Sequence, residues 1–268
     1  MNILDKIIAA KRREVADRKA MTSVRQLEVS PFFQTTPPSM LKTLLDPSKN
    51  GIIAEFKRRS PSKGDINVQA DVLATTRDYA SGGASGISVL TDETFFGGSW
   101  KDLDTAVQWG TPILRKDFII DEYQLLEARS HGASVILLIA ACLTPGEAKQ
   151  LAMSARAMEL EVLLELHDAD EMFHMNSAVT FVGINNRNLK SFEVNLQQSI
   201  ELVEQLPDDL PAIAESGINS ISTLLELEDV GFKGFLMGEF FMRQSDPGAA
   251  FLTFSDELMK ARQRRNSI

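Results

Sequence analysis

From Gly51 onward, short apolar runs alternate with longer segments of mixed polarity. Each run is rich in Ile, Val, Leu or Phe and is followed by a polar loop and an amphipathic stretch, the pattern of a buried strand leading into a helix. We expect strands at 51–56, 86–90, 112–116, 134–139, 161–166, 180–185, 211–215 and 234–238.

Helix signals lie between these strands. Thr144-Pro145, a cap residue followed by proline at the first helical position, starts a helix that we expect to run to Met158, and Ser220 precedes another over 221–227. Eight strand–helix units imply parallel strands joined by right-handed crossovers. Their number favours an α/β fold of the (β/α)8 TIM-barrel type over an open doubly wound sheet, whose G-x-G-x-x-G fingerprint is missing after the first strand.

Residues 1–50 have a different pattern. Ile3, Leu4, Ile7 and Ile8 recur at helical spacing before a charged run, and a segment with three prolines follows. We therefore expect residues 1–50 to form an N-terminal helical extension packed on the barrel, and residues 51–268 to form the barrel itself.

Composition narrows the range of partners. The chain has 268 residues, of which 44% are hydrophobic, so it can bury a large core in one domain. Its formal net charge of -9 argues against a nucleic-acid partner, and the basic stretch 260–265 is interpreted as a solvated helix end. No apolar run approaches the roughly 20 residues that span a bilayer. The single cysteine, Cys142, can form no intramolecular disulfide and is interpreted as a small buried hydrophobe, so we expect a cytoplasmic protein without a membrane partner.

Charged or amide side chains end several expected strands. The first, third, fifth and seventh strands end in Glu55, Lys116, Glu165 and Glu215, and the sixth ends in Asn185. In a barrel the carboxyl ends of the strands converge on one face, and alternate strands share a layer. The pattern predicts a ring of these four side chains at the mouth, with Asn185 and Lys57 just above it. Such a ring suits proton transfer, with Lys116 as the acid and a glutamate as the base, although mutually neutralising ion pairs would give the same pattern.

Glycines after the last two strands indicate a phosphate site. Ser216-Gly217 and Gly238-Glu239 stand where barrel enzymes bind phosphate through backbone N–H groups. The Glu239 carboxylate would repel a phosphate unless its side chain points away and only its N–H is used. The three histidines, His131, His167 and His174, are not spaced as metal ligands, but His167 follows Glu165 closely enough to reach the mouth.

Five motifs, in this order along the chain, resemble those of the indole-3-glycerol-phosphate synthase family. They are IAEFKRRSPS at 53–62, LRKDFI at 114–119, LELH at 164–167, GINNRNL at 183–189 and AESGI at 214–218. The amino-terminal segment 3–12 is also similar to the opening helix of the family, so the resemblance covers nearly the whole chain. It implies a cofactor-free, metal-free carboxy-lyase of tryptophan biosynthesis. The substrate would be 1-(2-carboxyphenylamino)-1-deoxyribulose 5-phosphate, whose indole ring is closed with loss of carbon dioxide and water to give indole-3-glycerol phosphate.

The resemblance also implies residue roles. Lys116 would be the general acid on the ketone oxygen and Glu165 the base for dehydration, while Lys57 with Glu55 would hold the anthranilate carboxylate or assist the later proton transfer. Asn185 and Glu215 would orient hydroxyl groups. The implied phosphate and ribulose contacts are Ser60, Arg187, Ser216, Gly217, Gly238 and the N–H of Glu239. The implied apolar pocket is formed by Phe96, Phe118, Leu137, Ile139 and Leu189.

Two positions depart from the family pattern: Glu239 stands where many members have serine, and Asn188 where aspartate is common. Two other functions are alternatives. A barrel like phosphoribosylanthranilate isomerase would carry a cysteine base just after the first strand, where this chain has Glu55-Phe56-Lys57. A non-catalytic phosphosugar-binding barrel would need no matched set of acids and bases.

Overall fold

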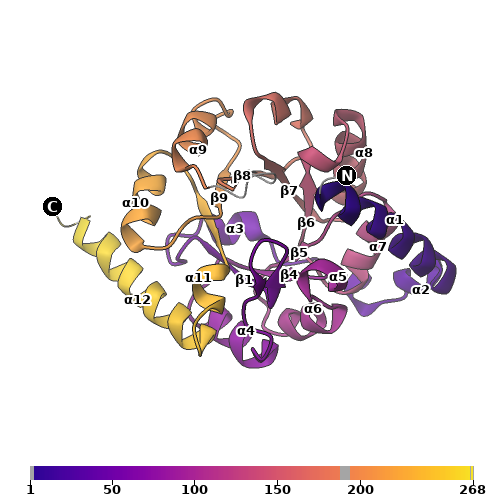
Figure 1. The fold of residues 1–268 in the computed structure, drawn as a ribbon, viewed down its shortest axis with the longest axis horizontal. Helices are drawn as coiled ribbons and strands as arrows, with labels where there is room; N and C mark the ends of the chain where they lie inside the picture. The colour runs from indigo at the N-terminus through magenta and orange to yellow at the C-terminus, as the bar shows by residue number, and fades with distance from the viewer. Residues whose placement is uncertain (1–2, 188–193, 266, 268) are drawn as a thin grey trace.

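The structure, a computed structural model, describes residues 3–187, 194–265 and 267. Eight parallel strands close into a barrel in the order β1-β10-β9-β8-β7-β6-β5-β4 (Figure 1). They are β1 (Ile52–Phe56), β4 (Gly86–Leu90), β5 (Ile113–Lys116), β6 (Val135–Ile139), β7 (Glu161–Leu166), β8 (Phe181–Asn185), β9 (Ala212–Glu215) and β10 (Gly234–Met237). The predicted TIM barrel is confirmed, and each predicted strand boundary lies within one residue of the observed one.

Helices surround the barrel (Figure 1). The longer ones are α4 (Val72–Ser81), α6 (Trp100–Val107), α7 (Tyr123–Ser130), α8 (Pro145–Ala157), α9 (Leu196–Val203), α10 (Ile221–Asp229) and α12 (Pro247–Arg265). Short elements in the loops are β2 (Arg59–Ser60), β3 (Gly64–Asp65), α5 (Glu93–Phe96), η2 (Ala140–Cys142), η3 (Ala169–His174) and α11 (Glu239–Met242). The antiparallel pair β2–β3 follows β1 and was not predicted.

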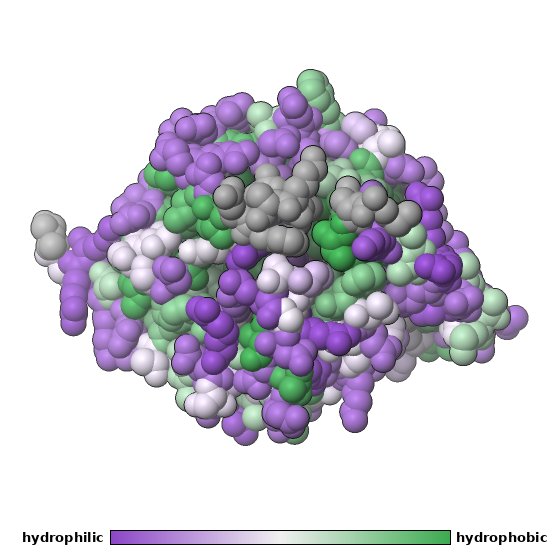
Figure 2. All heavy atoms as spheres, viewed as in Figure 1, coloured by the Kyte–Doolittle hydropathy of each residue, from purple (hydrophilic) through white to green (hydrophobic). Residues whose placement is uncertain are grey.

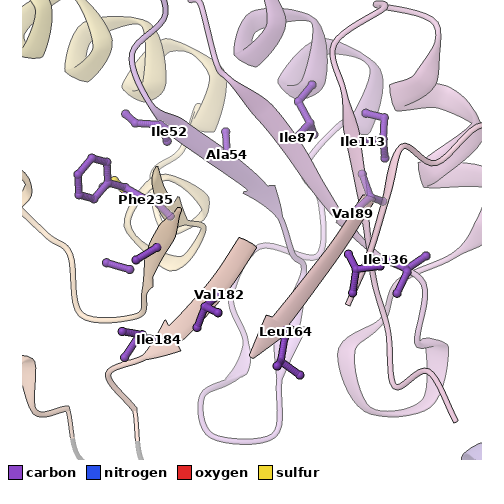
Figure 3. Close-up of a cluster of buried hydrophobic side chains, with 14 of the residues drawn as sticks. Ile52, Ala54, Ile87, Val89, Ile113, Ile136, Leu164, Val182, Ile184 and Phe235 are labelled. Carbon is purple, nitrogen blue, oxygen red and sulfur yellow. The ribbon is translucent and has the colours of Figure 1, made fainter. Parts of the chain in front are cut away.

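Side-chain alternation along the strands separates two apolar layers. Ile52 and Ala54 belong to the layer between barrel and helices, together with outward residues of other strands such as Val89 and Leu164 (Figure 3). Ile53, between Ile52 and Ala54, belongs instead to the cluster that fills the barrel. Residues two positions apart on a strand therefore point to the same side of the sheet. A side chain that follows an interior residue by two positions at the carboxyl end of a strand thus points into the mouth of the barrel.

The extension before β1 contains α1 (Ile3–Met21), α2 (Val24–Glu28), η1 (Pro31–Gln34) and α3 (Met40–Leu44). Helix α3 closes the end of the barrel opposite the mouth, because Met40 and Leu44 belong to the interior cluster. Gly86 makes room for it: a Cβ at this position would lie 2.3 Å from Met40 Cε. Glu161, at the start of β7, accepts hydrogen bonds from the backbone N–H groups of Met40 and Leu41 and so holds the amino end of α3.

Helix α1 is anchored by a fully buried lysine. Lys11 Nζ lies 2.7 Å from Glu14 Oε2 on α1, 3.0 Å from Asp92 Oδ2 after β4 and 2.8 Å from Asp117 Oδ1 after β5. Asp92 caps α5 by accepting hydrogen bonds from the N–H groups of Phe95 and Phe96. One cation on α1 therefore joins two loops at the mouth.

Figure 2 shows the face of the molecule seen in Figure 1, with hydrophilic residues spread over it and hydrophobic residues in scattered patches. Among the described residues, none of the helices combines the length and the apolar character needed to cross a membrane.

Candidate active site

One ammonium group faces three carboxyl groups at the mouth of the barrel. Lys116 Nζ lies 3.8 Å from Glu165 Oε2, 3.8 Å from Glu215 Oε2 and 3.9 Å from Glu55 Oε2. The four residues are the last or next-to-last residues of β5, β7, β9 and β1, which are alternate strands of the barrel. Each side chain points inward because it stands two positions after an interior residue, as Glu55 stands after Ile53.

Lys57 adds a second cation to this group. Its Nζ lies 2.5 Å from Glu55 Oε1, and Ser88 Oγ donates a hydrogen bond of 3.3 Å to the other oxygen, Oε2. Burial opposes ionisation of Glu55, but the charges of Lys57 and Lys116 outweigh it and lower the pKa of this carboxyl. Glu55 therefore remains a carboxylate between the two lysines.

The three carboxyl groups around Lys116 differ in the direction of their pKa shifts. Burial, together with the neighbouring charge of Glu165, raises the pKa of Glu215 to about 8. Burial also opposes the ionisation of Glu165, but Lys116 and His167 lower its pKa to about 2. The three glutamates outweigh the burial of Lys116 and raise its pKa. At neutral pH the ring thus contains a charged lysine, two carboxylates and one carboxylic acid, which are groups that can give and accept protons.

Gly183 on β8 makes room for Glu215. A Cβ at position 183 would lie 2.1 Å from Glu215 Oε1, closer than any side-chain carbon can approach. The strand that carries Asn185 therefore needs a glycine beside the ring for a steric reason.

Glu165 has two further neighbours. Asn185 Nδ2 donates a hydrogen bond of 3.1 Å to Glu165 Oε1, and His167 Nε2 lies 3.3 Å from the same oxygen. One oxygen of Glu165 is thus turned toward Asn185 and His167, and the other faces Lys116.

A pocket of about 200 Å³ opens above the ring. It is lined by every predicted site residue that the structure describes: Glu55, Lys57, Ser60, Phe96, Lys116, Phe118, Leu137, Ile139, Glu165, Asn185, Arg187, Glu215, Ser216, Gly217, Gly238 and Glu239. Leu189 and Asn188 lie outside the described residues. The structure thus gathers these residues from all parts of the barrel around one cavity.

The pocket has an apolar side that the sequence analysis predicted only in part. The rings of Phe96 and Phe118 lie with their centroids 6.0 Å apart. Ile3, Leu4 and Ile7 of α1 also line the pocket, although their helical spacing had indicated only packing on the barrel. No local signal distinguishes a helix residue that faces a neighbouring loop from one that faces an empty cavity.

Three basic side chains surround Glu239, which lines the pocket. They lie at 3.4 Å (Arg187), 3.7 Å (Lys63) and 3.6 Å (Arg243) from its carboxylate, and of the three Arg187 also lines the pocket. The carboxylate of Glu239 therefore does not point away from the rim of the pocket, which was the condition for its compatibility with a phosphate. Lys63 and Arg243 were not predicted, because neither stands at a strand end.

The turn after β9 has an unusual backbone. Ser216 and Gly217 both have positive φ, at 67° and 78°. Asn186 Nδ2 supports the turn by donating a hydrogen bond of 2.7 Å to the carbonyl oxygen of Ser216. A non-glycine residue in this region is uncommon and marks a turn whose shape the surrounding structure holds.

The other two histidines make their contacts away from the ring, whereas Cys142 lies near Glu165. His131 pairs with Asp104, and the ring nitrogens of His174 contact the carbonyl oxygens of Glu171 and Leu143. Burial raises the pKa of the partly buried Cys142 thiol, so the thiol is a poor candidate for the base of an isomerase. Within the described ranges, no group of three or more His, Cys, Asp or Glu side chains is arranged to hold a metal ion.

Comparison with solved structures supports the fold. The chain is similar to tryptophan synthase subunit alpha from Legionella pneumophila, with a TM-score of 0.61, 14% identity and coverage of 84% of this chain and 97% of that one. It is similar to 3-hexulose-6-phosphate synthase from Salmonella typhimurium, with a TM-score of 0.62, 10% identity and coverage of 78% and 99%. At these identities the likeness concerns the barrel alone.

Sequence comparison is more specific. The family model described as indole-3-glycerol phosphate synthase matches residues 4–254. An indole-3-glycerol phosphate synthase from Bacteroides thetaiotaomicron is 47% identical over 255 residues, which cover 94% of this chain and 97% of that protein. One from Exiguobacterium sibiricum is 44% identical over 249 residues, with coverage of 92% and 94%. With the ring of acids and bases at the mouth of its barrel, the chain belongs to the indole-3-glycerol phosphate synthase family.

Proposed function

We propose that the protein converts 1-(2-carboxyphenylamino)-1-deoxyribulose 5-phosphate into indole-3-glycerol phosphate, using the ring around Lys116 for the proton transfers. The reaction is that of a carboxy-lyase of tryptophan biosynthesis. It joins a carbon of the aromatic ring to the ketone carbon and then loses carbon dioxide and water. The observation that carries the proposal is the ammonium group of Lys116, which lies within 4 Å of three buried carboxyl groups in a pocket that Phe96, Phe118 and Arg187 also line.

Lys116 is proposed as the general acid. When the ring closes, negative charge develops on the former ketone oxygen, and a charged donor that has lost most of its hydration stabilises this charge and delivers a proton. Its glutamate neighbours keep Lys116 protonated before the reaction, as its raised pKa indicates.

Glu165 is proposed as the base that removes a proton during the loss of water. It is ionised at neutral pH, and its Oε2 is the oxygen that faces Lys116. Asn185 and Glu215 would orient substrate hydroxyl groups, and the carboxylic acid of Glu215 would donate a hydrogen bond. Lys57 would hold the anthranilate carboxylate until it leaves, and Glu55 would fix the position of Lys57 through their 2.5 Å contact.

The two sides of the pocket suit the two ends of the substrate. Phe96, Phe118, Leu137 and Ile139 offer an apolar wall for the aromatic ring. The other end would bind the phosphate and ribulose through Ser60, Arg187, Ser216, Gly217, Gly238 and the N–H of Glu239.

We also propose that residues 1–50 act as an extension of the catalytic barrel of residues 51–268, and that the protein is cytoplasmic. The contact between Lys11 and the two loops at the mouth supports a functional link between these parts. The single cysteine and the net charge of -9 support a reducing compartment and a small-molecule partner, not a nucleic acid or a membrane.

Replacing each lysine in turn tests the assignment of the acid. We expect Lys116→Met to fold and to lose roughly 100-fold or more in kcat, the range for removal of a general acid. Lys57→Met should mainly raise KM. Product formation is followed by indole absorbance, and binding by titration with substrate.

A Lys233→Met variant, changed at a position outside the pocket, serves as the matched control. Near-normal kcat in Lys116→Met together with a large loss in Lys57→Met would transfer the acid role to Lys57. A wild-type protein that binds the substrate and forms no indole product would contradict the enzymatic function itself.

A further inference from the structure

His167 lies just outside the pocket, between two carboxylates. Its Nε2 is 3.3 Å from Glu165 Oε1, and its Nδ1 is 3.4 Å from Glu171 Oε2. The side chain is 11% exposed, and both ring nitrogens are buried without a well-directed hydrogen bond. The ring is therefore surrounded by negative charge and shielded from water, and it does not line the cavity.

Two hydrogen bonds also fix the backbone of His167. Its N–H donates a hydrogen bond of 2.7 Å to Glu171 Oε2, the same oxygen that faces the ring. Its carbonyl oxygen accepts a hydrogen bond of 3.1 Å from Gln198 Nε2 on α9. Elements η3 and α9 thus hold the backbone of His167 from two sides.

The charged groups that face Glu165 come from several elements. Besides His167, the neighbouring cation is Lys116 on β5. Glu215 on β9 and Glu171 on η3 are acidic. Cys142 on η2 is close enough to Glu165 to be affected by the charge of that carboxylate. Asn185 on β8 is a neutral donor. Lys116 faces Oε2, whereas His167 and Asn185 contact Oε1.

We infer that His167 is a positioning residue for Glu165: held between Glu165 and Glu171, it turns one oxygen of Glu165 outward and leaves the other toward Lys116 and the substrate. The inference rests on the proposed role of Glu165 as the base. The imidazole of His167 also keeps Glu165 ionised, because a cation at this distance favours the carboxylate. Although burial opposes the charged imidazole, contacts with Glu165 and Glu171 raise the pKa of His167 to about 10.

The wild-type protein provides the first test, which needs no variant to fold. The ¹⁵N shifts of the histidine rings are recorded from pH 6 to 8.5 in protein without substrate, and His167 is identified by sequential assignment. We expect the ring to remain doubly protonated over this range. A ring that titrates near 6.5, the ordinary value, overturns the inference.

The second test is the pH profile of kcat. His167→Asn removes the charge while keeping a polar side chain, so we expect the acid limb to move upward by about one pH unit. The loss of turnover should be larger at the acidic end of the profile, where Glu165 titrates, than at pH 8, where Glu165 is ionised in both proteins. His131→Asn, which changes a histidine that pairs with Asp104, is the matched control and should leave the acid limb unchanged.

Glu165→Gln separates this inference from the function on which it rests. If Glu165→Gln loses turnover while His167→Asn keeps the wild-type acid limb, the positioning role is wrong and the base assignment stands. If Glu165→Gln retains near-normal turnover, the base assignment itself fails. An upward shift in His167→Asn combined with an inactive Glu165→Gln supports both.

Discussion

Glu239 places a carboxylate among the cations where the phosphate is proposed to bind. Arg187, Lys63 and Arg243 already neutralise it in the absence of substrate. A bound phosphate would have to share these cations with the carboxylate or displace it. This arrangement costs binding free energy that a neutral residue would not cost.

We therefore predict that Glu239→Ser lowers KM roughly threefold to tenfold with little change in kcat, because a rim charge acts mainly on binding. Steady-state kinetics at low ionic strength would measure the effect, and added salt should reduce it. Glu226→Ser, at an exposed position on α10, is the control. A higher KM in Glu239→Ser would mean that the glutamate assists substrate binding instead of competing with the phosphate.

Gly183 offers a test of how closely the ring is packed. In Gly183→Ala the new methyl group would occupy the place of Glu215 Oε1, so the Glu215 carboxyl group must move. We expect kcat to fall about 10- to 100-fold, as for a misplacement of about 1 Å in an active site. The melting temperature should change much less.

Gly146→Ala on α8 is the matched control, since a Cβ there meets no atom within 4 Å. Unchanged turnover in Gly183→Ala would show that the position of Glu215 has little influence on the reaction.

The members of the ring were predictable from the sequence because strand periodicity and barrel geometry act together. Glu55, Lys116, Glu165 and Glu215 each end an apolar run at an interior position, and alternate strands meet in one layer. The charge state of each group was not predictable in this way. Glu165 and Glu215 end their apolar runs alike, yet their pKa values move in opposite directions. Burial and the charge of Glu165 raise the pKa of Glu215, whereas Lys116, His167 and Asn185 outweigh burial at Glu165 and lower its pKa.

Helix α1 depends on a buried cation. Lys11→Met would leave Asp92 and Asp117 without this partner inside the protein, and breaking a buried pair from one side costs on the order of 3–5 kcal/mol. We predict a clear fall in urea stability together with a lower kcat/KM, because α1 lines the pocket and Asp92 caps the helix that carries Phe96.

Lys6→Met, at an exposed position of the same helix, controls for the change in helix composition and should leave both quantities nearly unchanged. If Lys11→Met lowered stability without affecting kcat/KM, the ion pairs of Lys11 would stabilise the fold and have no effect on the active site.

Elements whose positions depend on barrel closure could not be predicted. Lys11 stands in a charged run that resembles a solvated helix face, and its partners come from loops about a hundred residues later. Helix α3 has only five residues, too few for helical periodicity to be recognised, and yet its Met40 fills the barrel interior. The pair β2–β3 has two residues per strand, too short for periodicity to reveal.

The eight-strand barrel, in contrast, was predictable because every strand carries its own signal. Apolar runs at near-regular intervals, each followed by a helix, leave few topologies open. The pairing of β1 with both β4 and β10 closes the ring that the number of units had indicated.

The stability of the protein should decrease as the pH rises from 6 to 9. Glu215, whose pKa is about 8 in the native state, keeps a proton that the unfolded chain, with a pKa near 4.5, has released. Its contribution is full below pH 4.5 and is lost as the pH rises through 8. His167 contributes fully below 6.5 and loses this contribution as the pH rises through about 10.

Urea unfolding at several pH values measures this decrease, and Glu215→Gln provides the comparison. Removing the titrating group should make the decrease smaller by about 1 to 3 kcal/mol, since one pKa unit corresponds to about 1.4 kcal/mol. Equal decreases in both proteins would contradict the assignment of the raised pKa to Glu215.

The anchor of α1 also bears on how the protein is made. A ribosome releases Lys11 long before Asp92 and Asp117, and at about 5–20 residues per second the delay is on the order of 5–20 seconds. During that time the ammonium group must stay hydrated, and Ile3, Leu4 and Ile7 have no cavity to line. Helix α1 thus cannot dock fully before Asp117 has been synthesised, and a nascent chain interrupted before that point would expose an apolar surface for chaperones to bind.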